Sequence, residues 1–271
     1  MDNRCIGVFD SGLGGLTCVK EIIHLLPEES IVYFGDTGRV PYGTRSAETI
    51  IKYARSDIRF LKQFDPKLIV IACGTVSTTA LELARGEYPK DIILGVTHPS
   101  AAAAAKATKN CKVGVIGTSR SINSGKYEEE LKAINPEIQV FSNSCPLFVP
   151  LVENGFLDKP ATYLIAEEYL KPLKEAGVDT LILGCTHYPL IKKVIGEIMG
   201  EDVILIDPGK ETAKYIKHAI LNGRVAAASA SPKHSFYVSD KVDGFTEMAE
   251  RFLNQKITGN VEKIDIEKYT I

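Results

Sequence analysis

The fold of this chain is decided by the segment Leu181-Ile-Leu-Gly-Cys185-Thr-His-Tyr-Pro189, because an upstream segment repeats its design. In that upstream segment, Ile69-Val-Ile-Ala-Cys73-Gly-Thr75, an apolar run again ends in a small residue, a cysteine and a polar turn. Short apolar runs of this kind are typical of buried parallel strands, and open α/β sheets bind ligands at the carboxyl ends of their strands. The pattern therefore predicts two thiols, Cys73 and Cys185, that face one site.

Predicted strands recur in the second half of the sequence in the same order and at a nearly constant offset. The matched segments are 6–9 with 113–116, 31–34 with 138–141, Cys73 with Cys185, and 92–95 with 203–206, at offsets of 107, 107, 112 and 111 residues. We therefore predict an α/β protein made of two pseudo-symmetric, flavodoxin-like doubly wound domains with the active site in the cleft between them. The alternative is one continuous α/β sheet whose buried strands merely look alike.

The first domain is predicted to comprise residues 1–97 plus 209–271, and the second residues 98–208. The C-terminal part of the chain has no counterpart in the repeat, so we expect it to complete the first domain. Its predicted elements are a strand at 236–238, a helix near 245–253 and a strand near 261–264. No low-complexity linker separates the two halves, which favours a tight cleft.

Helical periodicity fills the spaces between the predicted strands. Apolar residues recur at helical spacing from 46 to about 64, where Ser46 can cap the helix, and a further helix is expected from about 77 to 85. Another helix opens at Pro99, where proline in the first turn costs no hydrogen bond.

Composition excludes several classes of partner. The chain has 271 residues, 45% of them hydrophobic and 24% charged, with a formal net charge of −2. So small a net charge gives no reason to expect nucleic acid or a membrane surface as a partner. No apolar run approaches the roughly 20 residues that span a bilayer, and the N-terminus lacks the layout of a signal peptide. We expect a cytoplasmic protein whose six cysteines remain thiols.

A glycine-rich loop, Asp10-Ser-Gly-Leu-Gly-Gly15, lies between the first predicted strand and its helix. Its spacing is not that of a dinucleotide-binding loop, because the third glycine directly follows the second. Such a loop can bring backbone N–H groups to an anion of carboxylate size, or it can be only a tight βα turn. Asp10, at the end of the strand, can hold or deprotonate a neighbouring group.

The remaining cysteines and histidines give weaker signals. Four cysteines lack a polar turn and are interpreted as structural; they are Cys5, Cys18, Cys111 and Cys145. No metal site is expected at Cys185-Thr-His187, because no paired ligand motif supplies the other ligands. His24 and His218 fall in predicted helices and are assigned to packing, whereas His98 and His234 lie beside strand ends and stay undecided.

Several motifs in one order resemble the glutamate racemases of the cofactor-independent aspartate/glutamate racemase superfamily, and the resemblance runs through nearly the whole chain. The motifs are Phe9-Asp-Ser-Gly-Leu-Gly-Gly15, Asp36 with Pro41-Tyr-Gly43, Ala72-Cys-Gly-Thr75, Pro146-Leu-Phe-Val-Pro-Leu-Val-Glu153 and Leu183-Gly-Cys-Thr-His-Tyr-Pro189. The resemblance implies interconversion of L- and D-glutamate to supply peptidoglycan, without metal or other cofactor. It also implies a homodimer.

The resemblance also implies a role for each site residue. Inverting a stereocentre by proton transfer needs a base on one face of Cα and an acid on the other. Cys73 would deprotonate D-glutamate with help from Asp10, and Cys185 would deprotonate L-glutamate with help from His187 and Glu153. The substrate would be held by side-chain or backbone groups of Asp10, Ser11, Pro41, Tyr42, Gly43, Gly74, Thr75, Thr118, Thr186 and His187.

One residue departs from the family pattern. Asparagine usually follows the first cysteine in this family, whereas Gly74 stands here, so a side-chain amide is missing. The backbone N–H of Gly74 and the hydroxyl of Thr75 remain, and we expect substrate binding to survive. Restoring the amide by Gly74→Asn is expected to lower KM for glutamate. Two alternatives stay open: a racemase for aspartate or another amino acid, and a non-catalytic amino-acid-binding module.

Overall fold

The part of the chain that the structure describes forms two separate parallel sheets, one in each domain. The computed structural model describes residues 1–228, 231–240, 245–254, 256–257 and 261–270. The six-stranded sheet has the order β10-β9-β2-β1-β3-β4, and the four-stranded sheet has the order β6-β5-β7-β8. The strands are β1 (Ile6–Asp10), β2 (Ile31–Gly35), β3 (Leu68–Ile71), β4 (Ile93–Gly95), β5 (Lys112–Gly117), β6 (Gln139–Ser144), β7 (Thr180–Leu183), β8 (Ile204–Ile206), β9 (His234–Val238) and β10 (Val261–Lys263).

The two sheets repeat one topology. The order β2-β1-β3-β4 of the larger sheet corresponds strand for strand to the order β6-β5-β7-β8 of the smaller one. The prediction of two pseudo-symmetric doubly wound halves is therefore confirmed, and the alternative of one continuous sheet is wrong. Strands β9 and β10 join the larger sheet beyond β2, as expected of the C-terminal part of the chain. All strands of the larger sheet fall in 1–97 and 209–271, although the boundaries themselves stay a prediction.

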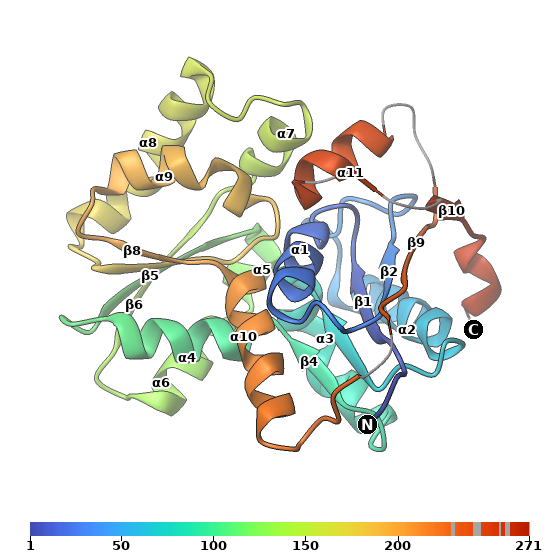
Figure 1. Cartoon of the computed structure of the whole chain (residues 1–271). Coiled ribbons are helices and arrows are strands. Elements are labelled where there is room, and N and C mark those ends of the chain that lie inside the picture. The colour runs from blue at the N-terminus through green and yellow to red at the C-terminus, as the bar shows by residue number, and fades with distance from the viewer. Residues whose placement is uncertain (229–230, 241–244, 255, 258–260, 271) are drawn as a thin grey trace.

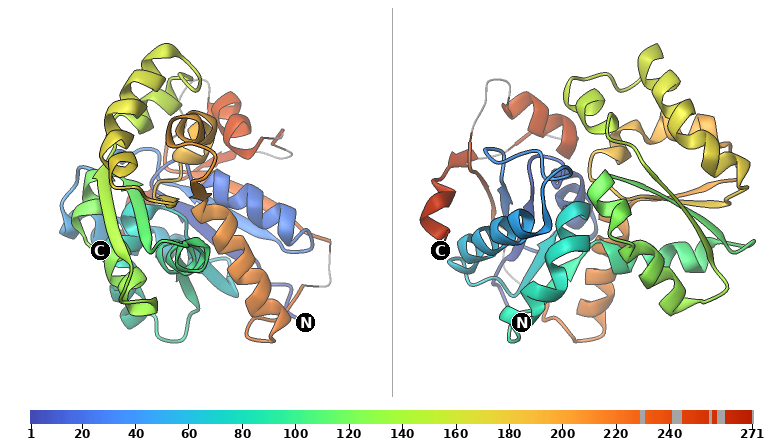
Figure 2. Two further views of the ribbon diagram at one scale, coloured as in Figure 1. Left: turned by 90° about the vertical axis from the view of Figure 1, so that its left-hand side faces the viewer. Right: turned by 180° about the vertical axis from the view of Figure 1, so that it is seen from behind.

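Helices cover both faces of each sheet (Figures 1 and 2). In the first domain α1 and α11 lie on one face and α2 and α3 on the other; in the second, α4 and α6 lie opposite α8 and α9. The α-helices are α1 (Leu16–Leu25), α2 (Ala47–Lys62), α3 (Gly74–Glu87), α4 (Thr97–Ala107), α5 (Ser119–Asn123), α6 (Lys126–Ile134), α7 (Phe148–Glu153), α8 (Pro160–Glu175), α9 (Lys192–Met199), α10 (Pro208–Leu221) and α11 (Phe245–Leu253). Two 3₁₀ turns are η1 (Tyr188–Ile191) and η2 (Ile266–Tyr269).

Two helix starts show how well sequence signals mark boundaries. Ser46 caps α2 as predicted, because its Oγ accepts the N–H of Thr49 at 3.3 Å. The helix expected from 77 instead begins at Gly74, so that Cys73 is its N-cap residue. Glycine and β-branched residues have low helix propensity, but burial of this first turn outweighs that preference.

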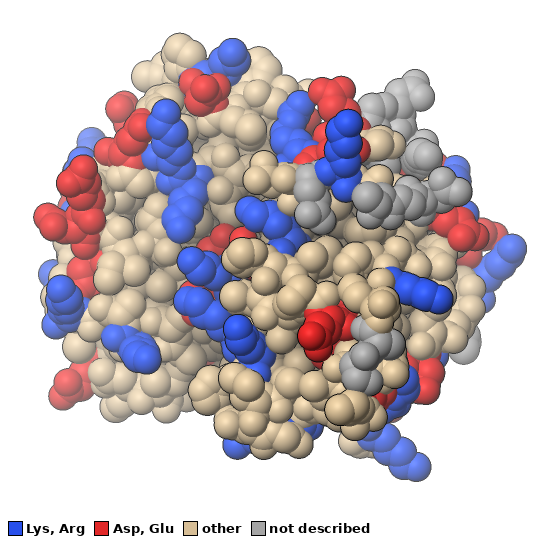
Figure 3. Space-filling model, in the orientation of Figure 1, with Lys and Arg blue, Asp and Glu red and all other residues tan. Residues whose placement is uncertain are grey.

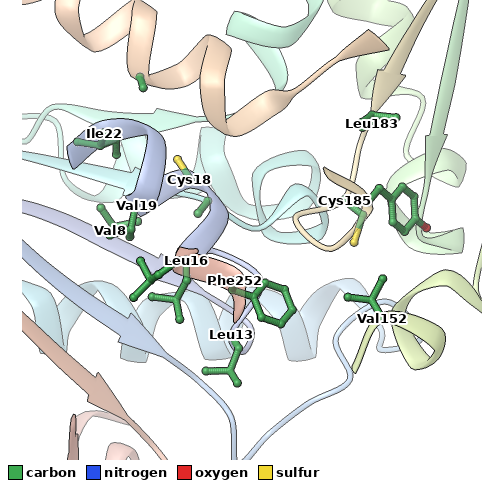
Figure 4. Packing of buried hydrophobic residues seen from close by; sticks show 14 of the residues in the cluster. Val8, Leu13, Leu16, Cys18, Val19, Ile22, Val152, Leu183, Cys185 and Phe252 are labelled. Atoms are coloured by element: carbon green, nitrogen blue, oxygen red, sulfur yellow. The ribbon is translucent and has the colours of Figure 1, made fainter. Parts of the chain in front are cut away.

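One hydrophobic cluster is continuous across both domains. It includes Val8 and Leu16 from the first domain and Leu183 and Cys185 from the second, all buried. Figure 4 shows the ring of Phe252, from the C-terminal helix α11, on the side of the cleft that faces Val152 and Cys185. A shared core of this kind holds the two halves close together, in agreement with the tight cleft expected from the sequence.

A buried ion pair ties the returning chain to the first domain. Lys67 Nζ lies 2.6 Å from Glu29 Oε2, and both side chains are almost completely buried. Lys67 also donates to the carbonyls of Asp2 and Ala226, while Glu29 accepts the N–H of Ala228 at 3.1 Å. The pair thus holds Ala226 and Ala228, which follow α10, against the first domain.

The surface carries both signs of charge. In the face shown in Figure 3, acidic and basic side chains are interspersed, and lysines and arginines gather over the region of α9 and α10. Within the described ranges, no helix is long and apolar enough to cross a bilayer.

Candidate active site

A cavity of about 360 Å³ lies where the carboxyl ends of the two sheets meet. Cys73 follows β3 and Cys185 follows β7, so the two cysteines enter the cavity from equivalent strands of opposite domains. Other lining residues are Ser11, Gly12, Val40, Pro41, Tyr42, Gly43, Thr44, Gly74, Thr75, Thr118, Ser119, Pro146, Val149, Pro150, Glu153, Thr186 and His187. Of the site residues expected from the sequence, all but the fully buried Asp10 line this cavity.

Cys73 sits in a buried environment that favours its protonated form. Its Sγ donates to Ser11 Oγ at 3.5 Å. Burial, together with the nearby Asp10 carboxylate, raises the pKa of the Cys73 thiol to about 12. As the N-cap residue of α3, Cys73 also lies at the positive end of the helix dipole, which stabilises any negative charge formed there.

Cys185 lies beside a histidine that carries a positive charge. His187 Nδ1 is 3.9 Å from Cys185 Sγ, and His187 Nε2 is 3.1 Å from Glu153 Oε1. Burial by itself would lower the pKa of His187, but the hydrogen bonds to Cys185 and Glu153 outweigh it and raise this pKa to about 10. The imidazolium can therefore stabilise a thiolate on Cys185 at neutral pH.

Asp10 is fully buried between the two domains and has no direct hydrogen bond to Cys73. Its Oδ2 accepts the N–H of Gly12 at 2.9 Å, and its Oδ1 accepts the hydroxyl of Thr186 at 3.5 Å. Burial raises the pKa of Asp10, against the lowering effect of the His187 charge. Because Ser11 is the hydrogen-bond partner of Cys73, any help that Asp10 gives to that thiol is electrostatic or relayed.

The glycine loop donates a backbone hydrogen bond to Asp10 and allows the second domain to approach closely. The N–H of Gly12 is used by Asp10, and Gly12, Gly14 and Gly15 are absent from the described residues with positive φ. A Cβ on Gly14 would lie 2.1 Å from Thr186 Oγ1, so this glycine is required for contact with the second domain. Of the two interpretations left open by the sequence, the contacts favour a tight turn.

Hydroxyl groups from both domains meet at the wall of the cavity. Thr118 caps α5 by accepting the N–H of Ser121, and its Oγ1 lies 2.9 Å from Thr75 Oγ1. The N-termini of α3 and α5 thus face one space from opposite domains. Helix N-termini favour bound anions, so this arrangement suits a carboxylate.

The loop after β2 is held by a buried charged cluster. Arg39 Nε lies 2.6 Å from Asp36 Oδ2, and Arg39 Nη2 lies 2.9 Å from Asp57 Oδ1. The hydroxyl of Tyr42 donates a hydrogen bond to Asp36. Arg39 also stacks on the ring of Tyr53 with 4.2 Å to its centroid. Burial and the neighbouring Asp36 raise the pKa of Asp57 well above its ordinary range. The cluster fixes Tyr42 at the cavity wall.

Several residues that line the cavity or pack against its lining were not predicted from the sequence. Val40, Thr44 and Ser119 line the cavity without belonging to a recognisable chemical pattern. Phe252 packs edge-on against His187 with 5.2 Å between ring centroids, a contact made by the C-terminal part of the chain. The histidines left undecided lie elsewhere: His98 pairs with Glu130, and His234 begins β9.

Gly74 lies close to the backbone of the second domain. A Cβ on this residue would lie 2.4 Å from the carbonyl oxygen of Gly184, a distance that real Cβ atoms do not adopt. The expectation that Gly74→Asn lowers KM stays a prediction, and the added side chain requires a small shift of the turn at Gly74 or at Gly184.

These features define a class of protein: a two-domain α/β protein in which one buried cysteine from each half faces a shared polar cavity. The sequence model of the Asp/Glu/hydantoin racemase family matches residues 6–216. A glutamate racemase of Geobacter metallireducens is 47% identical over 265 residues, which cover 97% of this chain and 97% of that protein.

Solved structures agree with this match. The glutamate racemase of Francisella tularensis, crystallised in complex with D-glutamate, superposes with a TM-score of 0.91 and 39% identity, covering 99% of this chain and 100% of that one. A glutamate racemase of Bacillus anthracis gives a TM-score of 0.92 and 41% identity, covering 98% of each chain. The chain belongs to the Asp/Glu/hydantoin racemase family, which confirms the resemblance seen in the sequence.

Removing the charge of Arg39 should be strongly destabilising. Arg39→Met leaves the buried carboxylate of Asp36 without its cation and buried Asp57 without its hydrogen-bond donor, which is expected to cost about 3–5 kcal/mol of unfolding free energy in urea denaturation. The matched control is Arg55→Met in α2, whose pair with Glu87 is exposed and is worth at most about 1 kcal/mol. Equal losses in the two variants would contradict the assigned role of the cluster.

The contribution of His187 to stability should depend on pH in a defined direction. Its pKa is about 10 in the folded protein against an ordinary 6.5, so its charged interactions are fully present below pH 6.5 and are lost as the pH rises toward 10. The difference in unfolding free energy between the natural protein and His187→Gln should therefore be largest near pH 6 and shrink toward pH 9.5. A difference that stays constant or grows would show that the ring is neutral when folded.

Proposed function

We propose that this protein interconverts L- and D-glutamate by proton transfer between Cα and two thiols. The observation that carries the proposal is the entry of Cys73 and Cys185 into one cavity from equivalent strands of opposite domains. The names of the relatives support glutamate as the substrate, as does D-glutamate in the complex of the Francisella tularensis protein.

The proposed reaction needs one thiolate and one thiol at the start. With L-glutamate bound, the Cys185 thiolate removes the α-proton while the Cys73 thiol delivers a proton to the opposite face of Cα. The product is D-glutamate, with Cys185 now a thiol and Cys73 a thiolate, and the reverse reaction exchanges these roles. Proton count and charge are conserved, so no oxidant or reductant takes part.

The charges near the two cysteines favour one thiol and one thiolate at the start of the proposed reaction. The raised pKa of Cys73 keeps its proton in place, while the His187 imidazolium, itself held by Glu153, stabilises negative charge on Cys185. In the D-to-L direction Cys73 must lose its proton before it can act as the base. Asp10 helps this step through Ser11, the hydrogen-bond partner of Cys73. We assign catalytic roles to Cys73 and Cys185, and positioning roles to Asp10, His187 and Glu153.

Substrate carboxylates are held by neutral donors in this proposal. Backbone N–H groups at the starts of α3 and α5 and the hydroxyls of the cavity wall would bind them, which also stabilises the charge that develops when Cα loses its proton. The proposed contacts come from Ser11, Pro41, Tyr42, Gly43, Gly74, Thr75, Thr118, Thr186 and His187.

The proposed product places the protein in bacterial cell-wall synthesis, as a source of D-glutamate for peptidoglycan. We propose a cytoplasmic location, because both thiols must stay reduced to act. We also propose a homodimer, since Val40 and Leu147 expose apolar surface next to the cavity-lining Pro41 and Pro146. A monomer in sedimentation velocity would contradict the dimer.

The function is tested by incubating the protein with L-glutamate in deuterated water, after EDTA treatment and without added cofactor. We expect D-glutamate to appear carrying deuterium at Cα, because the proton delivered by the opposite thiol comes from solvent. L-Aspartate under the same conditions should turn over far more slowly. Absence of D-glutamate, or turnover that requires added metal or pyridoxal phosphate, would refute the proposal.

Replacing either cysteine should stop racemisation. Cys73→Ser and Cys185→Ser are each expected to lose about 10²–10⁴-fold in kcat, because each removes the acid or base from one face of Cα. Cys111→Ser is the matched control, since Cys111 lies outside the cavity, and should keep near-natural activity. Substantial racemisation by either active-site variant would mean that one thiol serves both faces.

A further inference from the structure

The C-terminal helix α11 of the first domain reaches a residue of the second domain's half of the site. Its Phe252 packs against the ring of His187 with 5.2 Å between ring centroids and an angle of 84° between ring planes. Both side chains are almost completely buried. Figure 4 shows the Phe252 ring on the side of the cleft that faces Cys185 and Val152. An aromatic ring from one domain therefore covers the charged imidazole of the other.

Helix α11 also touches the segment that carries the carboxylate partner of His187. Glu153, which lies 3.1 Å from His187 Nε2, is the last residue of α7, and Gly155 follows two positions later. A Cβ built on Gly155 would lie 3.0 Å from Arg251 Nη1, so Arg251 packs over this turn. Two consecutive residues of α11 thus contact His187 and the turn that follows Glu153.

The remaining neighbours of the His187 ring are charged or titratable groups. Nδ1 lies 3.9 Å from Cys185 Sγ, and Nε2 faces Glu153. The charge of His187 also reaches Asp10 of β1, where it opposes the rise in that pKa caused by burial. A ring with a partner at each nitrogen keeps both partners in one orientation only, and packing against Phe252 restricts the ring to that orientation.

We propose that Phe252 holds the His187 ring in place, so that closure of the cleft completes the charged partner of Cys185. His187 belongs to the second domain and Phe252 to the first, so separation of the domains would remove the covering ring and admit water. Water screens the attraction between an imidazolium and a thiolate, which is strong only in a site of low dielectric constant. Phe252 is thus a positioning residue, and its catalytic consequence rests on the proposed racemase function.

The effect should fall on one of the two thiols. Helix α11 lies between β9 and β10, the two strands of the larger sheet that have no counterpart in the described part of the smaller one. Cys185 and Phe252 share one hydrophobic cluster, whereas Cys73 belongs to another. Loosening the contact at Phe252 should therefore weaken reactions in which Cys185 is the base and spare those in which Cys73 is the base.

Elimination from glutamate that carries chlorine on Cβ separates the two thiols, because it needs only one base. The thiolate takes the α-proton, the C–H electron pair forms a Cα–Cβ double bond, and chloride leaves with its own pair. The resulting enamine hydrolyses in water to 2-oxoglutarate and ammonium. In the proposed function, Cys185 is the base for the L-form of this compound and Cys73 is the base for the D-form.

The test uses Phe252→Leu in the full chain and follows the His187 ring by NMR. The ring signals of the five histidines are recorded from about pH 5.5 to 10.5, and the His187 signal is assigned by its absence in His187→Gln. The pKa of His187, about 10 in the natural protein, should fall by at least about one unit toward the ordinary 6.5, because a looser and wetter ring loses part of its hydrogen bonding to Cys185 and Glu153.

The same variant is assayed for elimination from both forms of the chlorinated glutamate. The ratio of the L-form to the D-form, each as kcat/KM, should fall at least about tenfold, the equivalent of one pKa unit. A merely structural role of Phe252 would lower both reactions together and leave the ratio unchanged.

The matched control is Phe236→Leu. Phe236, on β9, is buried in the same hydrophobic cluster and packs against Tyr33 with 6.4 Å between ring centroids. This variant also loses a buried aromatic ring of the first domain, so general loosening would appear in both variants. In Phe236→Leu the pKa of His187 should stay within about 0.3 unit, and the elimination ratio within about twofold, of the natural values.

The outcomes separate this inference from the proposed function. An unchanged titration of His187 in folded Phe252→Leu would overturn the positioning role, and the proposed function would stand if the unsubstituted protein racemises glutamate. A lowered pKa of His187 with an unchanged elimination ratio would break the link to Cys185 and also overturn the proposal. If the unsubstituted protein neither racemises glutamate nor eliminates chloride, the proposed function and the catalytic consequence of Phe252 fall together, while the titration still decides how the ring is held.

Phe252→Met keeps the proposal testable if Phe252→Leu does not fold. Methionine fills an irregular apolar space but has no flat ring, so the packing is largely retained and the fixed orientation is lost. The pKa of His187 and the elimination ratio should therefore change in the same directions as in Phe252→Leu. Natural values of both quantities in Phe252→Met would contradict a role for the aromatic ring.

Discussion

The whole site depends on the direct contact of two main-chain turns, one at the end of β3 and one at the end of β7. Each turn follows a fully buried strand, so neither can move without disturbing a sheet. Packing in the hydrophobic cluster that continues from one domain into the other keeps these turns in contact. Burial of the thiols, the raised pKa of Cys73 and the limited size of the cavity all follow from that contact.

The two domains share a topology but differ in the charges they place at the site. Cys73 has a hydroxyl and the buried carboxyl group of Asp10 nearby, whereas Cys185 has an imidazolium supported by Glu153. Backbone repetition therefore presents two thiols to one space, and local substitution gives the two thiols different charged neighbours. The proposed reaction uses that difference, because it starts from one thiol and one thiolate.

Sequence reasoning recovered the strands and their order because buried parallel strands are short apolar runs that end at small residues. It also brought together Cys73, Cys185 and His187, since the carboxyl ends of equivalent strands lie at one edge. It could not pair Arg39 with Asp57, because the two residues are 18 positions apart and Asp57 lies within a helix. Nor could it show that Gly74 approaches the Gly184 carbonyl, because that carbonyl is distant in sequence.

The return of the chain to the first sheet has a consequence for synthesis on the ribosome. Strand β2 is complete once residue 35 has been made, yet its outer neighbour β9 begins only at His234, after the entire second domain. Throughout that interval β2 exposes an unpaired row of N–H and C=O groups, the kind of edge that adds foreign strands. The nascent first domain therefore waits as an open-edged sheet while the inserted domain is translated, and the buried pair of Lys67 with Glu29 receives its last backbone partners only when Ala226 and Ala228 arrive.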